Sequence, residues 1–308
     1  MADVMRDERG QLMLVAALAI AVLLVGLALT LNTAIYTENL ATRTTDTHLS
    51  DANAYGEALE EGTGGLLDAV NREGGTYGEL ETKFDSSYEN WSSATATLGA
   101  ARGRVTNTTR VDETRGTRIA QSNASLDFTG GSDDWTVSTN EHVRGIRFNV
   151  SRNSLETGSD PFELVLDDGS DTVTTELSRN ATHVIVTVDA PSGVSTCETP
   201  VGAGEYVTID VTDGMLGRQP CSALDAIHDD LDGTLTVEFE EGSKAVGTYE
   251  LYTDDLYTAF DEAWDGLFGP DTGPTSEPAL YAVDVSYVFQ SGETRVEREV
   301  RIAPGEIA

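Results

Sequence analysis

Apolar and polar residues follow three successive patterns along this chain of 308 residues. No residue from Leu12 to Leu31 is charged, apolar residues recur every three or four positions up to residue 103, and from Arg104 they alternate with polar ones. These patterns are typical of a membrane helix, amphipathic helices and half-buried strands, respectively. They predict an α+β fold, in which an N-terminal transmembrane helix and a helical stalk precede a mainly antiparallel, β-sandwich-like external domain. The expected domains are a cytoplasmic leader (1–11), the transmembrane helix (12–31), the stalk (32–103) and the external domain (104–308).

The first pattern, LMLVAALAIAVLLVGLALTL, is long enough to cross a bilayer. Twenty residues make roughly 30 Å of helix, which is the thickness of the hydrocarbon core. A cleaved signal peptide is the alternative, but its apolar region is usually about 7–15 residues long and precedes an A-x-A-like site. We expect an uncleaved anchor in the cell membrane. Its N-terminus is expected to be cytoplasmic and its C-terminal domain extracellular, because Arg6 and Arg9 precede the run and Arg43 alone follows closely.

Two helices joined by a glycine-rich turn are predicted after the anchor. Three glycines, Gly62, Gly64 and Gly65, are expected to interrupt the first helix, and Gly74-Gly75 is expected to end it. We therefore expect the two helices to form an antiparallel pair close to the membrane. The apolar positions that define the two helices are Leu49, Ala52, Tyr55, Leu59, Leu66 and Val70, then Tyr77, Leu80, Phe84, Tyr88 and Trp91.

Strands separated by turn residues are predicted beyond Arg104, as in a sandwich or jelly-roll-like domain. A short amphipathic helix is predicted at Asp254–Phe268, and a closing hairpin turns at Ser291-Gly292. The predicted strands cover 143–150, 162–166, 172–177, 183–188, 206–211, 235–239, 281–289 and 294–302.

The charge of the chain limits the classes of partner that it is expected to bind. It has 53 acidic and 19 basic residues, a formal net charge of −34. Nucleic acid is not an expected partner, because no basic patch could displace counterions from phosphates. The same excess of acidic residues disfavours a polybasic lipid-binding surface. Abundant carboxylates with only two lysines are typical of extreme halophiles, whose surface charges are screened within roughly 3 Å at molar salt.

Two cysteines, Cys197 and Cys221, lie in the predicted external domain. An even number in an oxidising compartment favours a disulfide, and two buried thiols or half of a metal site are the alternatives. The tripeptide N-x-[ST] occurs repeatedly after the predicted anchor, which supports an external domain. These candidate glycosylation sites are Asn90, Asn107, Asn123, Asn149 and Asn180.

We expect the protein not to be an enzyme and to bind no cofactor or metal. The four histidines are scattered without zinc-ligand spacing, and no P-loop, dinucleotide fingerprint or nucleophile elbow is present. Aspartates cluster at 167–171 and 229–233, and calcium binding there is the alternative to solvated turns.

The segment Arg9-Gly10-Gln11, followed at once by the apolar run, resembles the N-terminus of archaeal pilin-like proteins. In that family a peptidase cuts after the glycine, and the hydrophobic helix packs into a filament core. The resemblance therefore implies a possible processing site at Gly10-Gln11. Residues 6–43 resemble, more closely, uncharacterised haloarchaeal single-pass proteins that accompany pilus- or secretion-type systems, and the resemblance is limited to this segment. Val15 stands where type IV pilins usually place glutamate, so an ordinary membrane anchor is the alternative.

These observations predict a membrane-anchored, pilin-like cell-surface protein with a structural or interaction role, as part of a pilus- or secretion-type system. Its expected partners are the lipid bilayer and other pilin-like subunits. The alternative is a tethered extracellular module that binds a glycan or peptide and does not assemble into filaments.

Overall fold

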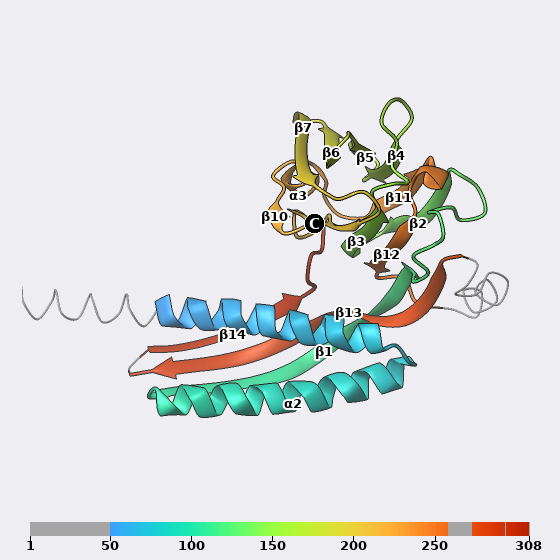
Figure 1. Cartoon of the computed structure of the whole chain (residues 1–308). Helices are drawn as coiled ribbons and strands as arrows, with labels where there is room; N and C mark the ends of the chain where they lie inside the picture. Colours follow the sequence, from blue (N-terminus) through green and yellow to red (C-terminus); the bar gives the residue numbers. More distant parts are fainter. Residues whose placement is uncertain (1–49, 258–272, 293, 308) are drawn as a thin grey trace, which may run out of the picture.

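The computed structural model describes residues 50–257, 273–292 and 294–307. Within these ranges, two helices pack along one part of an eight-stranded sheet and a six-stranded sheet covers another part (Figure 1). Every named strand pairing is antiparallel, which confirms the predicted α+β class with a sandwich-like domain. None of the helices in the described ranges has the length and apolar character needed to cross a membrane. The predicted membrane helix, Leu12–Leu31, and the possible processing site, Gly10-Gln11, lie outside the described residues.

The predicted helical pair is present. A first helix covers residues 50–73 and α2 covers Tyr77–Ala101. In the turn between them Gly74 and Gly75 have φ angles of +67° and +135°, which side chains with a Cβ rarely adopt. The side chain of Thr76 then accepts a hydrogen bond from the Glu79 amide, and the Glu79 carboxylate accepts one from the Thr76 amide. This reciprocal capping box fixes where α2 begins.

The prediction that Gly62, Gly64 and Gly65 interrupt the first helix is wrong, because the helix runs through all three. A Cβ on Gly62 would lie 2.6 Å from Cζ2 of Trp91, and a Cβ on Gly64 would lie 2.7 Å from Cγ of Pro304. Glycine at these two positions therefore lets α2 and the C-terminal segment approach the helix closely. Tertiary packing offsets the low helix propensity of glycine, which costs about 1 kcal/mol per residue relative to alanine.

The eight-stranded sheet has the order β10-β9-β8-β3-β12-β1-β13-β14. The first helix and α2 lie along its β1, β13 and β14 part. Its strands are β1 (Arg104–Gln121), β3 (Val143–Ser151), β8 (Tyr206–Asp210), β9 (Met215–Leu216), β10 (Gln219–Pro220), β12 (Gly247–Thr253), β13 (Thr275–Ser291) and β14 (Thr294–Ile302).

The six-stranded sheet has the order β2-β11-β4-β5-β6-β7 and forms the second layer of the sandwich. A short helix, α3 (Asp225–Asp230), and a 3-10 turn, η1 (Gly242–Lys244), flank β11 in the chain. The strands are β2 (Trp135–Glu141), β4 (Phe162–Asp167), β5 (Thr172–Arg179), β6 (His183–Ala190), β7 (Gly193–Pro200) and β11 (Leu235–Glu240).

Most predicted strands are confirmed, but the two longest strands extend well beyond the predicted segments. The confirmed ones coincide with β3, β4, β5, β6, β8 and β11, and the predicted hairpin is formed by β13 and β14. β1 was predicted only as part of a β-rich region, and β13 begins at Thr275 rather than Tyr281. Residues 254–257 are not helical, and the rest of the helix predicted at Asp254–Phe268 lies outside the described residues.

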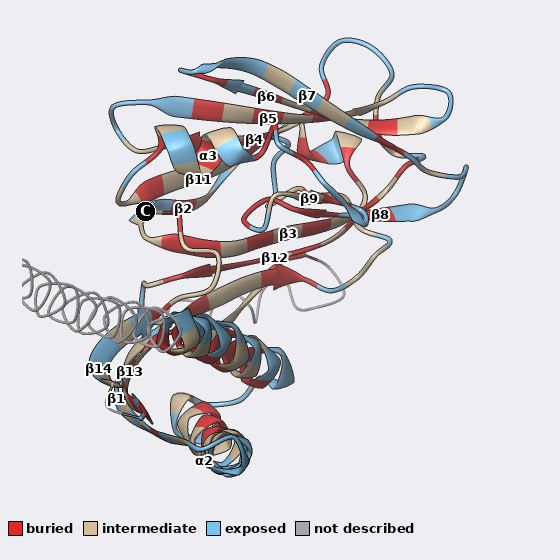
Figure 2. Ribbon diagram, turned by 90° about the vertical axis from the view of Figure 1, so that its left-hand side faces the viewer, coloured by how far each residue is buried: buried red, intermediate tan, exposed pale blue. Residues whose placement is uncertain are grey.

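Two large apolar clusters hold these layers together. Five aromatic rings pack between the two sheets, and the centroids of contacting rings lie 5.1 to 6.3 Å apart. The rings belong to Phe128, Phe148, Phe162, Phe239 and Tyr249. A separate cluster joins the helices to β13 and β14, with Leu59, Leu67, Leu80, Phe84, Val285 and Phe289 among its buried members. Figure 2 shows the six-stranded sheet on one side of β3 and β12 and the helical pair on the other. The helices therefore share a core with the sheet.

A buried arginine connects the helical pair to the sandwich. Arg144 on β3 is 0% exposed, and its guanidinium donates to Oδ1 of Asp68 on the first helix at 2.9 Å. It also donates to the carbonyls of Tyr281 at 2.6 Å and Leu280 at 3.1 Å. The side chain of Asn71, one turn beyond Asp68, donates to the Leu280 carbonyl and accepts from its amide. The end of the first helix is thus fixed to β3 and β13 by charged and polar contacts.

Candidate functional site

The described chain begins at the end of the molecule farthest from the sandwich (Figure 1). Asp51, at the start of the first helix, forms an ion pair of 2.7 Å with Arg104 at the start of β1. Arg104 in turn pairs with Ser291 at the end of β13, and Ser291 pairs with Thr294 at the start of β14. We call the surface formed by residue 50, the α2–β1 turn and the β13–β14 turn the entry end.

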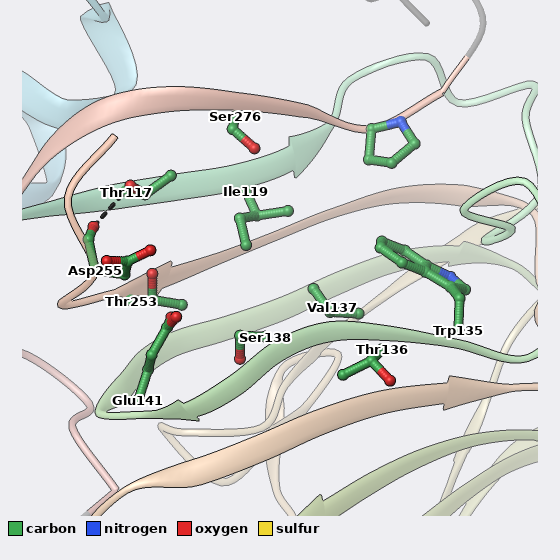
Figure 3. A pocket seen from close by; sticks show the side chains of 11 residues that line it. Thr117, Ile119, Trp135, Thr136, Val137, Ser138, Glu141, Thr253, Asp255 and Ser276 are labelled. Atoms are coloured by element: carbon green, nitrogen blue, oxygen red, sulfur yellow. Dashed lines mark hydrogen bonds between the residues drawn. The ribbon is translucent and has the colours of Figure 1, made fainter. Parts of the chain in front are cut away.

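A second candidate site is a cavity of about 260 Å³ between β2 and the β1–β12 ladder, here called the sandwich cavity (Figure 3). The indole of Trp135 lies at one end, and the carboxylates of Glu141 and Asp255 lie toward the other. The lining residues are Thr117, Ile119, Trp135, Thr136, Val137, Ser138, Glu141, Thr253, Asp255, Pro274 and Ser276.

Local contacts hold the walls of the sandwich cavity in place. Nε1 of Trp135 donates to the Phe128 carbonyl at 2.9 Å, and the hydroxyl of Thr117 donates to the Asp255 carbonyl at 2.7 Å. A Cβ on Gly130 would lie 2.2 Å from the Trp135 ring, so glycine is needed where the indole crosses the backbone. Together these contacts present an aromatic ring beside hydroxyl and carboxylate groups. An aromatic ring and polar groups in one cavity can contact a ligand through ring packing and hydrogen bonds.

Among the described residues near this cavity, a histidine–carboxylate pair, His142 and Asp254, has a structural function. Nδ1 of His142 lies 2.9 Å from Oδ2 of Asp254, and the other carboxylate oxygen accepts the His142 amide at 2.9 Å. The Asp254 amide donates back to the His142 carbonyl at 3.2 Å. These reciprocal backbone contacts join the segment before β3 to the segment after β12.

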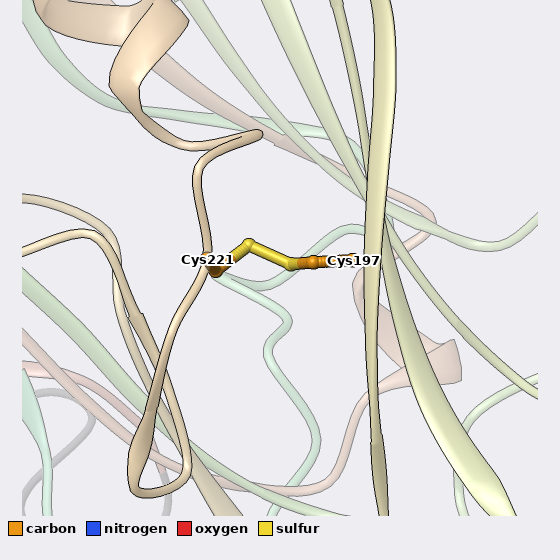
Figure 4. The surroundings of a disulfide bond; sticks show 2 residues. All are labelled: Cys197 and Cys221. Atoms are coloured by element: carbon orange, nitrogen blue, oxygen red, sulfur yellow. A yellow bond between two sulfur atoms is a disulfide. The ribbon is translucent and has the colours of Figure 1, made fainter.

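Cys197 and Cys221 form a disulfide, as predicted (Figure 4). Their Cα atoms are 5.7 Å apart, which lies in the usual range for a disulfide. Cys197 belongs to β7, the edge strand of the six-stranded sheet, whereas Cys221 follows β10 at the edge of the eight-stranded sheet. The bond therefore links the two layers of the sandwich at one side.

The candidate glycosylation sites differ in accessibility. Asn90 on α2 and Asn107 on β1 are exposed, and Asn180 is exposed in the turn between β5 and β6. The side-chain oxygen of Asn180 accepts the amides of Thr182 and His183, whereas Asn123 accepts the amide of Ser125. Asn123 is half-buried, and so is the fifth site, Asn149, which lies on β3 between β8 and β12.

The two aspartate-rich turns lie next to each other. Oδ1 of Asp168 accepts the amides of Ser170 at 2.7 Å and Asp171 at 2.8 Å, and its Oδ2 accepts the amide of Asp232 from the second turn at 3.2 Å. These backbone hydrogen bonds hold the pKa of Asp168 below its usual value. Within the described residues, no group of three or more His, Cys, Asp and Glu side chains is placed to hold a metal ion.

Acidic side chains face one another across the six-stranded sheet. Glu163 on β4 lies directly opposite Glu176 on β5 and Glu240 on β11. Partial burial, and then the negative charges of these two neighbours, raise the pKa of Glu163. A carboxyl group with a raised pKa in the folded state destabilises the fold once it is ionised.

We expect Glu163→Gln to raise the thermal midpoint of unfolding at low salt and neutral pH. The gain should shrink at about 1 M sodium chloride, where the charges are screened. It should also shrink as the pH falls through the raised pKa of Glu163, because protonation then removes the same repulsion from the unmodified protein. Glu297→Gln is the control, since Glu297 pairs with Arg295 at 3.2 Å and its neutralisation should give no gain. Equal midpoints for Glu163→Gln and the unmodified protein at low salt would contradict the prediction.

The fold defines an antiparallel two-sheet protein that carries a helical pair at the end where the described chain begins. Residues 6–132 match a protein family described as a family of unknown function (DUF7261). The matched stretch includes the predicted membrane helix, the helical pair and all of β1, and it ends before β2. No curated protein matches the chain.

Proposed function

We propose that the protein is a membrane-anchored, pilin-like cell-surface protein with a structural or interaction role in a pilus- or secretion-type system. The observation that supports this proposal is the position of the entry end. The first helix starts there, beside the α2–β1 and β13–β14 turns, and the sandwich lies at the other end. An anchor at residues 12–31 is therefore joined to the end from which the sandwich points away.

The helical pair and the long strands act as a spacer in this proposal. Each helix spans about 36 Å at 1.5 Å per residue, and both share a core with β13 and β14. A spacer with a buried core keeps a fixed length, whereas an unpacked linker would let the sandwich move freely. The spacer thus holds the sandwich at a set distance from residue 50, and in this proposal the predicted membrane helix is available to contact other subunits.

A tethered binding module that does not assemble is the second candidate function, and the sandwich cavity favours it. Trp135 offers an aromatic surface at one end of the cavity, and the carboxylates of Glu141 and Asp255 lie toward the other end. β2, which lines the cavity, is also an edge strand of its sheet. A glycan that stacks on the indole or a peptide that pairs with β2 is the ligand this chemistry fits.

Cysteine trapping in membranes tests the assembly proposal. Single cysteines placed in turn along Leu12–Leu31 of the full chain are oxidised in native membranes, and dimers are measured by gel electrophoresis. In an assembled state, dimers should form at positions three or four residues apart, because one face of the helix meets its neighbour. Val194→Cys is the control, since Val194 is 67% exposed on β7 in the sandwich.

The outcomes separate the two candidate functions. Dimers at helically spaced positions support the pilin-like subunit, and uniformly monomeric protein supports the non-assembling module. Mass spectrometry of the same preparation gives the mature N-terminus. A start at Gln11 supports pilin-type processing, and a start beyond Asn32 would remove the membrane anchor and with it both candidate functions.

A further inference from the structure

The first part of β1 leaves one edge of the eight-stranded sheet unpaired. β13 pairs with β1 along nearly its whole length, whereas β12 pairs only with residues 117–121. Among the described residues, no strand pairs with the other edge of β1 between Arg104 and Arg115. On that edge every second residue points its backbone N–H and C=O groups away from β13, where a strand of another chain could pair with them.

The outermost strands of both sheets have features that oppose such pairing. β10 is two residues long, β2 shifts its register twice against β11, and β7 contains Glu198 and ends at Pro200. β14 is rich in charged residues, which are Arg295, Glu297, Arg298, Glu299 and Arg301. Short length, irregular register, proline and charge therefore discourage pairing at these four edges.

The open edge of β1 has none of these features before its irregularity at Val111. Residues 105–109 are uncharged, and their valine and threonine side chains favour extended backbone. Val105 is 63% exposed and Val111 is 53% exposed. An uncharged, strand-forming segment on an open edge favours pairing between copies of the chain, so we expect it to be protected in another way.

A glycosylation motif, residues 107–109, lies in the middle of this edge. Thr106 and Thr108 lie opposite residues of β13 that are buried against the helices, so their side chains face the helices. Asn107 and Thr109 alternate with them and are exposed on the opposite face of the sheet. The asparagine amide and the threonine hydroxyl of the motif are therefore accessible together.

The other four motifs are less accessible. Asn90 and Ser92 are two positions apart on α2, so their side chains point in different directions. In the motif that begins at Asn180, the hydroxyl of Thr182 lies 2.8 Å from Nδ1 of His183. The remaining two asparagines, Asn123 and Asn149, are half-buried.

We infer that Asn107 carries an N-linked glycan that covers the open edge of β1 and prevents copies of the chain from pairing there. A glycan is bulky and hydrophilic, so it shields the exposed valines and the unpaired backbone groups. In the transfer, Nδ2 of Asn107 displaces phosphate from the anomeric carbon of a lipid-linked sugar phosphate. An N–C bond forms, the C–O bond to phosphate breaks, and one amide proton passes to the released lipid phosphate. The inference rests on the external placement of this domain in the proposed function.

Mass spectrometry of the full chain, purified from membranes of the cells that make it, tests the modification. Trypsin cuts after Arg104 and Arg110, and the peptide between them, VTNTTR, contains one acceptor asparagine. Its mass should be increased by whole sugar residues. Asn107→Gln and Thr109→Ala should abolish this increase, whereas Thr109→Ser keeps the motif and should retain it. Detection of VTNTTR only in its unmodified form would overturn the inference.

Cross-linking in native membranes tests what the glycan does. The Val105→Cys chain is treated with a bifunctional thiol reagent, with and without Asn107→Gln. Dimers linked through position 105 should appear only when Asn107 is replaced, and a further Thr109→Lys change should remove them by placing a charge on the edge. Asn90→Gln is the matched control, because it removes an exposed asparagine on α2 and should leave position 105 unlinked. Val194→Cys, a similarly exposed valine on β7, detects unspecific linking.

The outcomes distinguish this inference from the proposed function. Dimers linked through position 105 while Asn107 is glycosylated would show that this edge contacts another subunit, which would overturn the inference. Equal linking with and without Asn107→Gln would overturn the shielding function of the glycan. Cross-links along Leu12–Leu31 are measured in the same membranes and do not depend on Asn107. They test the proposed assembly separately, so either proposal can fail while the other stands.

Discussion

Replacing Asp68, whose side chain is 24% exposed, with asparagine is expected to lower the free energy of unfolding by about 3 kcal/mol, because it leaves the charge of the fully buried Arg144 without a carboxylate. Arg144 is 0% exposed and donates to Asp68 at 2.9 Å. Asparagine has nearly the same shape but no charge, so the guanidinium would keep its charge without a carboxylate. The carbonyls of Leu280 and Tyr281 would still accept hydrogen bonds from Arg144 but would not neutralise it.

Chemical denaturation of the two proteins, followed by circular dichroism, measures this effect. Asp85→Asn is the matched control, because Asp85 also joins a helix to the sheet through an arginine, Arg110, at 2.7 Å. Both side chains of that pair are partly exposed, and Arg110 also pairs with Glu113, so the loss should stay below about 1 kcal/mol. Similar losses in the two variants would show that the buried pair does not fix the helices to the sandwich.

The helical pair and the inner strands could be predicted because their burial repeats with a fixed period. β4 and β6 alternate strictly between buried and more exposed residues, and the spacing of Leu80, Phe84 and Tyr88 places all three in the core between α2 and the sheet. The cysteine pair could be predicted from compartment and number alone. In each case a single feature of the sequence was sufficient for the prediction.

β1 shows why the rest of the fold could not be predicted in this way. Its sequence, RVTNTTRVDETRGTRIAQ, is mostly polar, and its register shifts twice against β13, between Arg110 and Asp112 and between Thr114 and Arg115. The first shift inserts an extra residue, Val111, into β1, and the second inserts Tyr281 into β13, so no single alternation runs through this strand pair. Threonines such as Thr106 and Thr117 are buried in place of larger apolar residues.

The buried arginine was missed for a related reason. Continuing the alternation of Ile146, Phe148 and Val150 backwards would place Val143 outside the sandwich core. Gly145, with a φ of +63°, instead lets both Val143 and Ile146 enter that core, while Arg144 stacks at 4.3 Å on the ring of Tyr252. A glycine inside a strand, directly after an arginine, is the signal that could have indicated this irregularity.

Replacing both Cys197 and Cys221 with alanine is expected to cost roughly 3 kcal/mol of stability, since the bond closes a loop across a separation of 24 residues. Protection of backbone amides from exchange should fall mainly at one side of the sandwich, because β7 and the β9–β10 pair are edge elements of different sheets. β7 pairs with β6 along its other side, so β6 should retain more of its protection than β7.

Hydrogen exchange and denaturant unfolding together test this prediction. Amides of β7 and of residues 215–221 should exchange faster in the double-alanine variant, whereas amides of α2 and β13 should change little in conditions where the fold persists. Reduction of the unmodified protein should reproduce the loss, and the same reductant should leave the variant unchanged. Single-alanine variants are unsuitable controls, because the remaining thiol can pair between molecules.

Unchanged unfolding midpoints after reduction, with both thiols shown to be free, would mean that packing against the six-stranded sheet alone holds this side of the sandwich. The disulfide stabilises the protein by restricting the unfolded chain, and this gain would then be cancelled by an equal cost in the folded state.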